Sequence, residues 1–115
     1  RAEALRVDVS DYGAMQQAAA ELQARELVPD ALVNNAATWT IKPFHETGPA
    51  DWQNDLRVAL LGTLACCRAF LPAFIARGSG VIVNLASDAG RVGDVRDGPQ
   101  VGDVEHRVAD DLDED

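Results

Sequence analysis

Asp8, the Asn34–Asn35 pair and Ser87 are the polar residues best placed to do chemistry, because each follows a short apolar run. A carboxylate and two amides can hold a ligand by hydrogen bonds. A serine hydroxyl is a weak nucleophile by itself and needs a base or a proton donor beside it. The use of Ser87 therefore depends on which side chains the fold brings to it.

The apolar runs predict three β-strands, over residues 4–9, 31–37 and 81–86. Between them we expect two helices. The first is rich in Ala, Gln and Glu and is capped by Ser10, and the second covers about residues 50–77 with one broad apolar stripe. The last strand begins with an almost unbroken apolar run, so we expect it to be covered on both faces.

The order strand, helix, strand, helix, strand is typical of an α/β domain with parallel strands and right-handed crossovers. Ligands of such sheets bind beyond the carboxyl ends of the strands. Asp8, Asn34, Asn35 and Ser87 all fall at that edge, although they are far apart in the sequence. Their convergence predicts a binding site there.

The acidity of the chain is concentrated at its C-terminal end. The formal net charge is -9, and residues 94–115 hold nine acidic residues against Arg96 and Arg107, a net charge of -7. This segment has no aromatic residue and no sustained periodicity, which predicts a poorly ordered acidic tail behind a folded part over residues 1–93. The absence of a basic patch argues against a nucleic-acid partner.

Several other classes of protein fit the sequence poorly. We find no apolar run long enough to span a bilayer and no signal peptide after Arg1, so we expect a piece of a longer cytoplasmic protein without a membrane partner. The adjacent Cys66 and Cys67 favour a reduced, packed pair over a redox or metal site, and no metal is expected. The segment around Ser87 lacks the preceding Gly of a hydrolase nucleophile elbow.

Four segments together resemble the short-chain dehydrogenases/reductases, from about Leu5 to Gly93. They are DV at 8–9, LVNNAA at 32–37, a long helix that begins with DW and ends CCRAFLP at 66–72, and GVIVNLASDAG at 80–90. Each segment is weak alone, but their order and spacing are specific. The resemblance implies a partial Rossmann-type domain, with a doubly wound parallel sheet, over residues 1–93.

The resemblance further implies an oxidoreductase. Such an enzyme moves hydride between NAD or NADP and a small-molecule substrate, a secondary alcohol or ketone. The loop WTIKPF is similar to that of relatives acting on cyclic or acyl thioester substrates. The long helix over residues 50–77 would pair with a partner subunit, which implies a homo-oligomer.

The resemblance also implies roles for individual residues. Ser87 matches the catalytic serine that orients and polarises the substrate carbonyl or hydroxyl. Asp8 matches the acid that hydrogen-bonds the adenine amino group, with Val9 beside the ring. The segment that supports the sheet and lies along the cofactor ribose corresponds to Asn34, Asn35, Ala36 and Ala37. Ala37 stands where the family has Gly, and it adds a methyl group where the backbone and the cofactor approach each other closely.

The family's acid–base pair has no counterpart in this chain. A YxxxK motif should follow Ser87, and Gln100 and Val104 stand near the expected positions. The chain has a single tyrosine, Tyr12, in the first predicted helix, and a single lysine, Lys42, in a loop. Because a tyrosine needs a neighbouring cation to act as a base near neutral pH, we expect that this chain alone cannot transfer hydride.

Three further departures affect the proton relay, the cofactor site and the sheet. Ala59 stands where the family's long helix carries an Asn that holds a proton-relay water, and no glycine-rich phosphate loop of the TGxxxGIG type is present. The strand at 4–9 would also lack its usual strand neighbours, so we expect a marginal fold or association with another chain. The alternatives left open are a non-catalytic nucleotide-binding module and an interaction module that uses the long helix.

Overall fold

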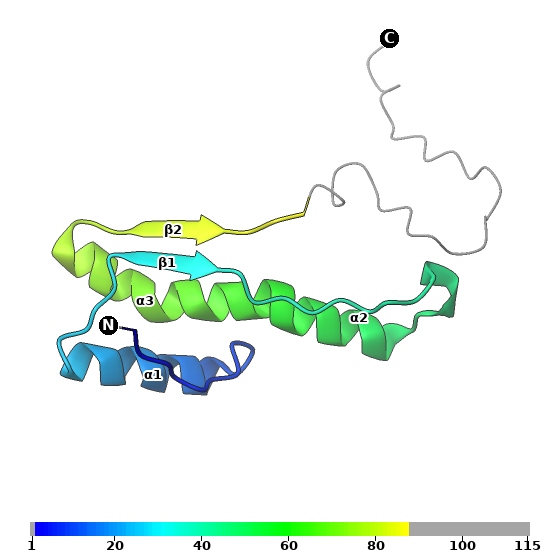
Figure 1. The fold of residues 1–115 in the computed structure, drawn as a ribbon, viewed down its shortest axis with the longest axis horizontal. Helices are drawn as coiled ribbons and strands as arrows, with labels where there is room; N and C mark the ends of the chain where they lie inside the picture. Colours follow the sequence, from blue (N-terminus) through cyan, green and yellow to red (C-terminus); the bar gives the residue numbers. More distant parts are fainter. Residues whose placement is uncertain (1, 88–115) are drawn as a thin grey trace, which may run out of the picture.

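A computed structural model describes residues 2–87 of the chain. Its elements are α1 (Tyr12–Ala24), β1 (Ala31–Asn34), the 3-10 turn η1 (Phe44–Glu46), α2 (Pro49–Leu56), the π-helical segment η2 (Arg57–Gly62), α3 (Thr63–Arg77) and β2 (Val81–Asn84). Figure 1 labels the α-helices and the two strands. The predicted tail at 94–115 and the end of the predicted domain at 88–93 lie outside the described residues.

The two strands form a parallel sheet. Ala31 pairs with Val81 and Asn34 with Asn84, so both strands end at the same level, and their arrowheads point toward the same end of the molecule in Figure 1. Leu85 donates its backbone N–H to the carbonyl of Asn34 over 3.0 Å, which extends the pairing by one residue. The predicted parallel sheet is therefore present in part, as two strands joined by one helical crossover within residues 2–87.

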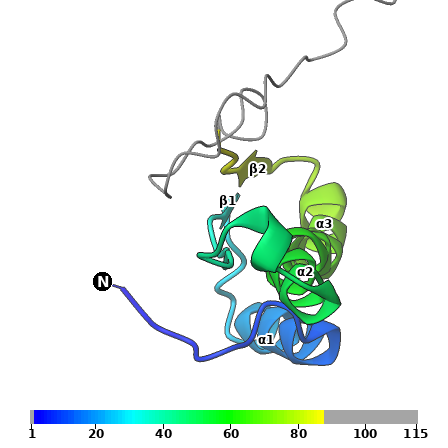
Figure 2. The same ribbon diagram turned by 90° about the vertical axis from the view of Figure 1, so that its right-hand side faces the viewer.

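The helices lie on one side of this sheet, as Figure 2 shows. Leu32 and Ile82 turn toward them and pack against the core. The alternating residues Val33 and Val81 remain 58% and 56% exposed. The prediction that the last strand is covered on both faces is therefore wrong for residues 2–87, because the long helix that connects β1 to β2 packs against one face and α1 packs on that helix, on the same side.

The prediction of a strand at residues 4–9 is also wrong. Residues 2–8 have no regular secondary structure, and within residues 2–87 the sheet has only two strands. A strand exists only when a neighbour takes up its backbone hydrogen bonds, so an apolar run alone does not make one. Val7 and Val9 still pack against the core, which keeps the segment beside the helices.

The core is formed where α1 packs against α3. Its buried members are Met15 from α1 and Ala65, Cys66, Phe70 and Phe74 from α3. The four α3 residues recur at helical spacing, so they form one face of the helix. Both cysteines are free thiols, and burial first, then the neighbouring Cys67, raises the pKa of Cys66. Cys66 is therefore a protonated thiol in the core.

The first helix begins one residue later than expected. Asp11, not Ser10, is its N-cap, because the Asp11 carboxylate accepts a hydrogen bond of 2.9 Å from the N–H of Ala14. The hydroxyl of Ser10 instead donates to Asp8, two residues earlier. A side chain that closes a turn with its neighbour is not available to cap the helix.

The second predicted helix runs from Pro49 to Arg77 without a break, through α2, η2 and α3. Gly48 is its N-cap and Pro49 its first residue, and the Asp51 carboxylate accepts from the N–H of Gly48 over 3.0 Å. Pro72 lies inside α3, which continues beyond it, so no new helix begins there. The π-helical segment was not expected from the sequence.

This long helix is apolar enough to matter for the membrane prediction. An 18-residue window has a mean hydropathy of 1.9, so by length and composition Pro49–Arg77 could cross a bilayer, contrary to the sequence prediction. That is weak evidence, because the core helix of a soluble protein passes the same test. Only 28% of the window is buried, so much of its apolar surface faces outward.

Candidate functional site

The first component of the site is a turn that holds Asp8. One carboxylate oxygen, Oδ1, accepts from the backbone N–H of Ser10 over 2.9 Å and from its hydroxyl over 2.6 Å. The other oxygen, Oδ2, lies 3.4 Å from Nη1 of Arg57 in the long helix. The carboxylate is therefore held in place from both sides while it remains exposed.

These donors lower the pKa of Asp8 below its usual value of 3.8. The hydroxyl of Ser10 has the largest effect and its N–H the next, desolvation opposes them, and Arg57 adds less. Because the folded-state pKa is depressed, the stabilisation is present above the usual pKa and is lost only as pH falls through the folded value. Asp8 is thus a charged acceptor at neutral and mildly acidic pH.

Ser10→Ala is expected to raise the pKa of Asp8 toward 3.8, and by more than Arg57→Gln does, because the hydroxyl is the larger cause. The measurement is an NMR titration of the Asp8 carboxyl carbon in each variant. A larger rise in Arg57→Gln than in Ser10→Ala would show that the ion pair, rather than the turn, sets this pKa.

A small cleft of about 60 Å³ adjoins this turn at the carboxyl end of β1. Its lining includes four residues that the sequence predicted for the cofactor, Val9, Asn34, Asn35 and Ala36. The structure therefore brings together residues from the segment before α1 and from the end of β1. Ala37, also predicted, lies one residue beyond the lining.

The long helix supplies the opposite side of the cleft. Gly62, Thr63 and Cys66 contribute to it, and the sequence reasoning missed all three. A Cβ on Gly62 would lie 2.9 Å from Cγ2 of Val9, so any larger residue would force the Val9 side chain or the helix to shift. A glycine inside a leucine-rich helix was the available signal, since such a residue commonly marks a close backbone approach.

Asn34 is the buried polar residue of the cleft. Its Nδ2 donates to Oδ1 of Asn84 on β2 over 2.8 Å and lies 3.4 Å from the Cys67 sulfur. The amide therefore ties the two strand ends to α3. These contacts make Asn34 a support of the sheet, whereas Asn35 and Ala36 are exposed and open to a ligand.

Ser87 lies three residues beyond β2, and its side chain is exposed. It does not line the cleft. The tyrosine and lysine of the chain are engaged elsewhere. The Tyr12 hydroxyl accepts from Nε2 of Gln16 on α1 over 2.9 Å, and Nζ of Lys42 lies 3.3 Å from the carboxylate of Asp51. Gln100 and Val104 lie outside the described residues.

Ala59 lies within the π-helical segment that faces the cleft through Gly62. Its carbonyl accepts from the Thr63 hydroxyl over 2.8 Å. π-turns inside α-helices occur frequently at functional sites. Here the extra residue in the turn lies where Arg57 and Gly62 meet the segment Asp8–Val9, so the irregularity coincides with the candidate site.

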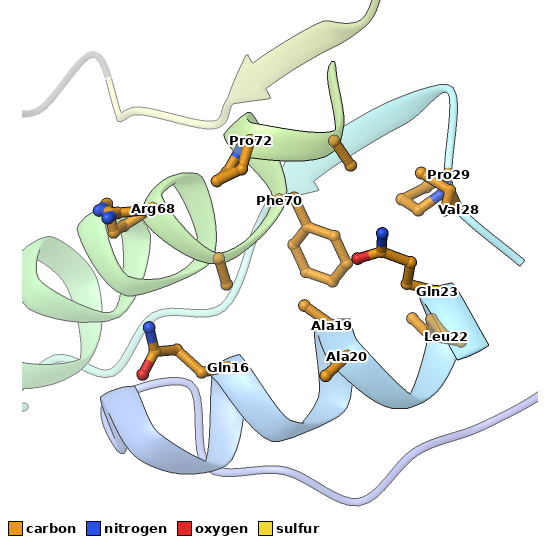
Figure 3. A pocket seen from close by; sticks show the side chains of 12 residues that line it. Gln16, Ala19, Ala20, Leu22, Gln23, Val28, Pro29, Arg68, Phe70 and Pro72 are labelled. Atoms are coloured by element: carbon orange, nitrogen blue, oxygen red, sulfur yellow. The ribbon is translucent and has the colours of Figure 1, made fainter. Parts of the chain in front are cut away.

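A larger cavity, of about 170 Å³, lies elsewhere, between α1 and α3. Figure 3 shows Phe70 at its centre, with Gln16 and Gln23 from α1 and Arg68 from α3 around it. None of the predicted site residues lines it. Small alanines on both helices leave this space, so it is a groove between the packed helices.

Comparisons with known proteins agree with this geometry. A family model described as short chain dehydrogenase matches residues 1–97. The chain is 41% identical over 85 residues to galactitol 2-dehydrogenase (L-tagatose-forming) of Cereibacter sphaeroides, and 36% identical over 85 residues to D-threitol dehydrogenase of Mycolicibacterium smegmatis. Each match covers 74% of this chain and 33% of the relative.

A solved structure has a similar fold. It is a gluconate 5-dehydrogenase from Burkholderia cenocepacia in complex with NADP and tartrate, with a TM-score of 0.67 and 36% identity, and the match covers 70% of this chain and 32% of that one. The predicted partial α/β, Rossmann-type fold is therefore confirmed, although the chain spans only about a third of the length of these relatives. Because the family model covers most of the chain and the relatives agree, this chain is a member of the short-chain dehydrogenase family.

Proposed function

We propose that this chain forms the adenosine-binding side of an NAD or NADP site, and that it binds the nucleotide without transferring hydride on its own. The observation that carries the proposal is the cleft, which unites Val9, Asn35 and Ala36 next to the oriented carboxylate of Asp8. In this role the carboxylate accepts from the adenine amino group, and the exposed segment after β1 lies along the ribose.

The size of the cleft supports a partial site. Sites for small molecules and cofactors typically enclose about 300–1,000 Å³, and this cleft has about 60 Å³. The residues present fit the adenosine end, since an ionised acceptor and a buried supporting amide are in place. The bound cofactor would supply the hydride chemistry, and the 115 residues include no glycine-rich phosphate loop.

For the reaction of the longer relatives, we propose a secondary alcohol or its ketone as substrate. The names of the two relatives, which act on D-threitol and galactitol, favour a polyol over a cyclic or acyl thioester compound. In this role the Ser87 hydroxyl orients the reacting oxygen. Tyr12 and Lys42 are not proposed as its acid–base pair, because they are bonded elsewhere and lie in separate elements.

The test is to titrate the purified chain with NADH and NADPH, following chemical shifts, and to assay turnover with secondary alcohols. We expect weak binding of both cofactors, no turnover, and a loss of binding in Asp8→Asn. Glu46→Gln, which removes an exposed acid on η1, serves as the matched control. Turnover by the chain alone, or no binding at millimolar cofactor, would contradict the proposal.

A second role has its own support, namely association through the long helix. Leu56, Leu60, Leu64, Leu71 and Ile75 recur at helical spacing and are between 41% and 71% exposed. They lie on a different face from the buried Phe70 and Phe74. Such a stripe is unfavourable in water, and we propose that a second copy of the chain covers it.

A further inference from the structure

Arg57 reaches the candidate site from the first turn of the π-helical segment, although 49 residues separate it from Asp8. Its Nη1 atom lies 3.4 Å from Oδ2 of Asp8 and also donates to the hydroxyl of Ser10. Its Nη2 atom lies 3.4 Å from Oδ1 of Asn54. The guanidinium is therefore held beside the carboxylate by three different partners.

The ion pair is open to a ligand. The side chains of Arg57 and Asp8 are 49% and 58% exposed, and a pair so exposed contributes little to stability. The carboxylate retains acceptor capacity beyond the bonds from Ser10 and Arg57, and a guanidinium carries more N–H groups than these contacts use. A bound molecule thus meets a free acceptor position and a free donor side by side.

This pairing matches one edge of one base. Adenine presents an amino group next to a ring nitrogen, that is, a donor beside an acceptor. A 6-oxo purine such as hypoxanthine presents a carbonyl oxygen where adenine has its amino group, and that oxygen would face the carboxylate. The acceptor at Asp8 and the neighbouring donor at Arg57 therefore match adenine better than a 6-oxo purine.

We propose that Arg57 is a base-reading residue, whose guanidinium donates to the adenine ring nitrogen beside the amino group that Asp8 binds. This role rests on the proposed function, because it requires adenine at Asp8. It assigns base specificity to the long helix in addition to the turn before α1. The π-helical segment is the element that positions the guanidinium for this contact.

The experiment titrates the full chain with AMP, IMP, 7-deaza-AMP and 1-deaza-AMP, each followed by NMR chemical shifts. We expect wild type to bind AMP about tenfold more tightly than IMP, the effect of ~1.4 kcal/mol. Wild type should bind one of the two deaza nucleotides, the one that lacks the ring nitrogen contacted by Arg57, about tenfold more weakly than AMP. Arg57→Ala should bind AMP about tenfold more weakly than wild type does, and it should bind that deaza nucleotide as tightly as it binds AMP.

Two variants separate base reading from charge. Arg57→Lys keeps the charge but not the planar fork, so it should also lose the discrimination between AMP and the deaza nucleotide. Arg68→Ala removes an exposed cation of α3 for which no hydrogen bond or ion pair is found within residues 2–87, and should bind as wild type does. The deaza comparison on wild type needs no variant to fold.

The results distinguish this role from the proposed function. If wild type binds AMP and Arg57→Ala binds it within twofold or more tightly, the guanidinium does not read the base, and the proposed function stands. Equal binding of AMP and both deaza nucleotides by wild type would likewise show that Arg57 does not read the base. If wild type binds no adenine nucleotide, the proposed function is overturned and the role of Arg57 with it.

Discussion

Phe74→Ala is expected to lower the free energy of unfolding by about 3–5 kcal/mol, the usual cost of removing a buried aromatic ring. Phe74 is 5% exposed and packs in the core that joins α1 to α3. The backbone of Gly80 also lies against its ring, so closely that a Cβ there would come within 2.4 Å of the ring. The space left by the ring can close only if the turn that leads into β2, which contains Gly80, moves toward α3.

The measurement is chemical denaturation followed by circular dichroism. Phe44→Ala is the matched control, because the same side chain is removed from a position that is 79% exposed and only stacks on Trp52, with ring centroids 5.9 Å apart. The control should lose at most about 1.5 kcal/mol. Equal losses in the two variants would show that α1 and α3 do not form the stabilising core.

Leu64→Glu is expected to weaken self-association of the chain by about 10–10²-fold. In a twofold-symmetric dimer each copy loses one leucine at the interface, and because Leu64 is already half-buried in the single chain, its burial there contributes about half of the ~1.5–3 kcal/mol of a fully exposed leucine. Leu64 is 55% exposed in the single chain and lies in the middle of the exposed stripe on the long helix. A carboxylate placed there would also have to be desolvated in the dimer.

Sedimentation or light scattering across a concentration series measures this change. The control is Leu27→Glu, since Leu27 is 45% exposed but follows α1, away from the stripe. It should associate as wild type does. A wild-type chain that stays monomeric at high concentration would refute the helix-mediated dimer, whereas equal weakening in both variants would point to a general loss of solubility.

The elements that the sequence predicted correctly are those with a local cause. β1, β2 and the long helix follow from short apolar runs, helical spacing and the Gly48–Pro49 start, all of which act between residues close in the chain. That the ends of β1 and β2 lie at one edge also followed from sequence, because parallel strands joined by a helix leave their carboxyl ends at the same edge. Val9 lines the same cleft as Asn35 and Ala36 without belonging to a strand.

The wrong predictions concern features that depend on residues far away in the sequence. Residues 4–9 are apolar enough for a strand, but a strand needs a neighbour, and none pairs with them within residues 2–87. The exposure of Val81 depends in the same way on which face the helices occupy. No pattern inside either segment carries that information.

The sequence by itself determined the family, the order of the elements and the residue types available for a nucleotide, because these follow from motif spacing and composition. Only the tertiary structure decided which groups meet. It placed Arg57 beside Asp8 and Gly62 against Val9. It also brought the Asn34 amide into contact with Asn84 and Cys67. These contacts join residues that are remote in the chain, and they depend on the docking of the long helix and its π-turn, which local patterns do not specify.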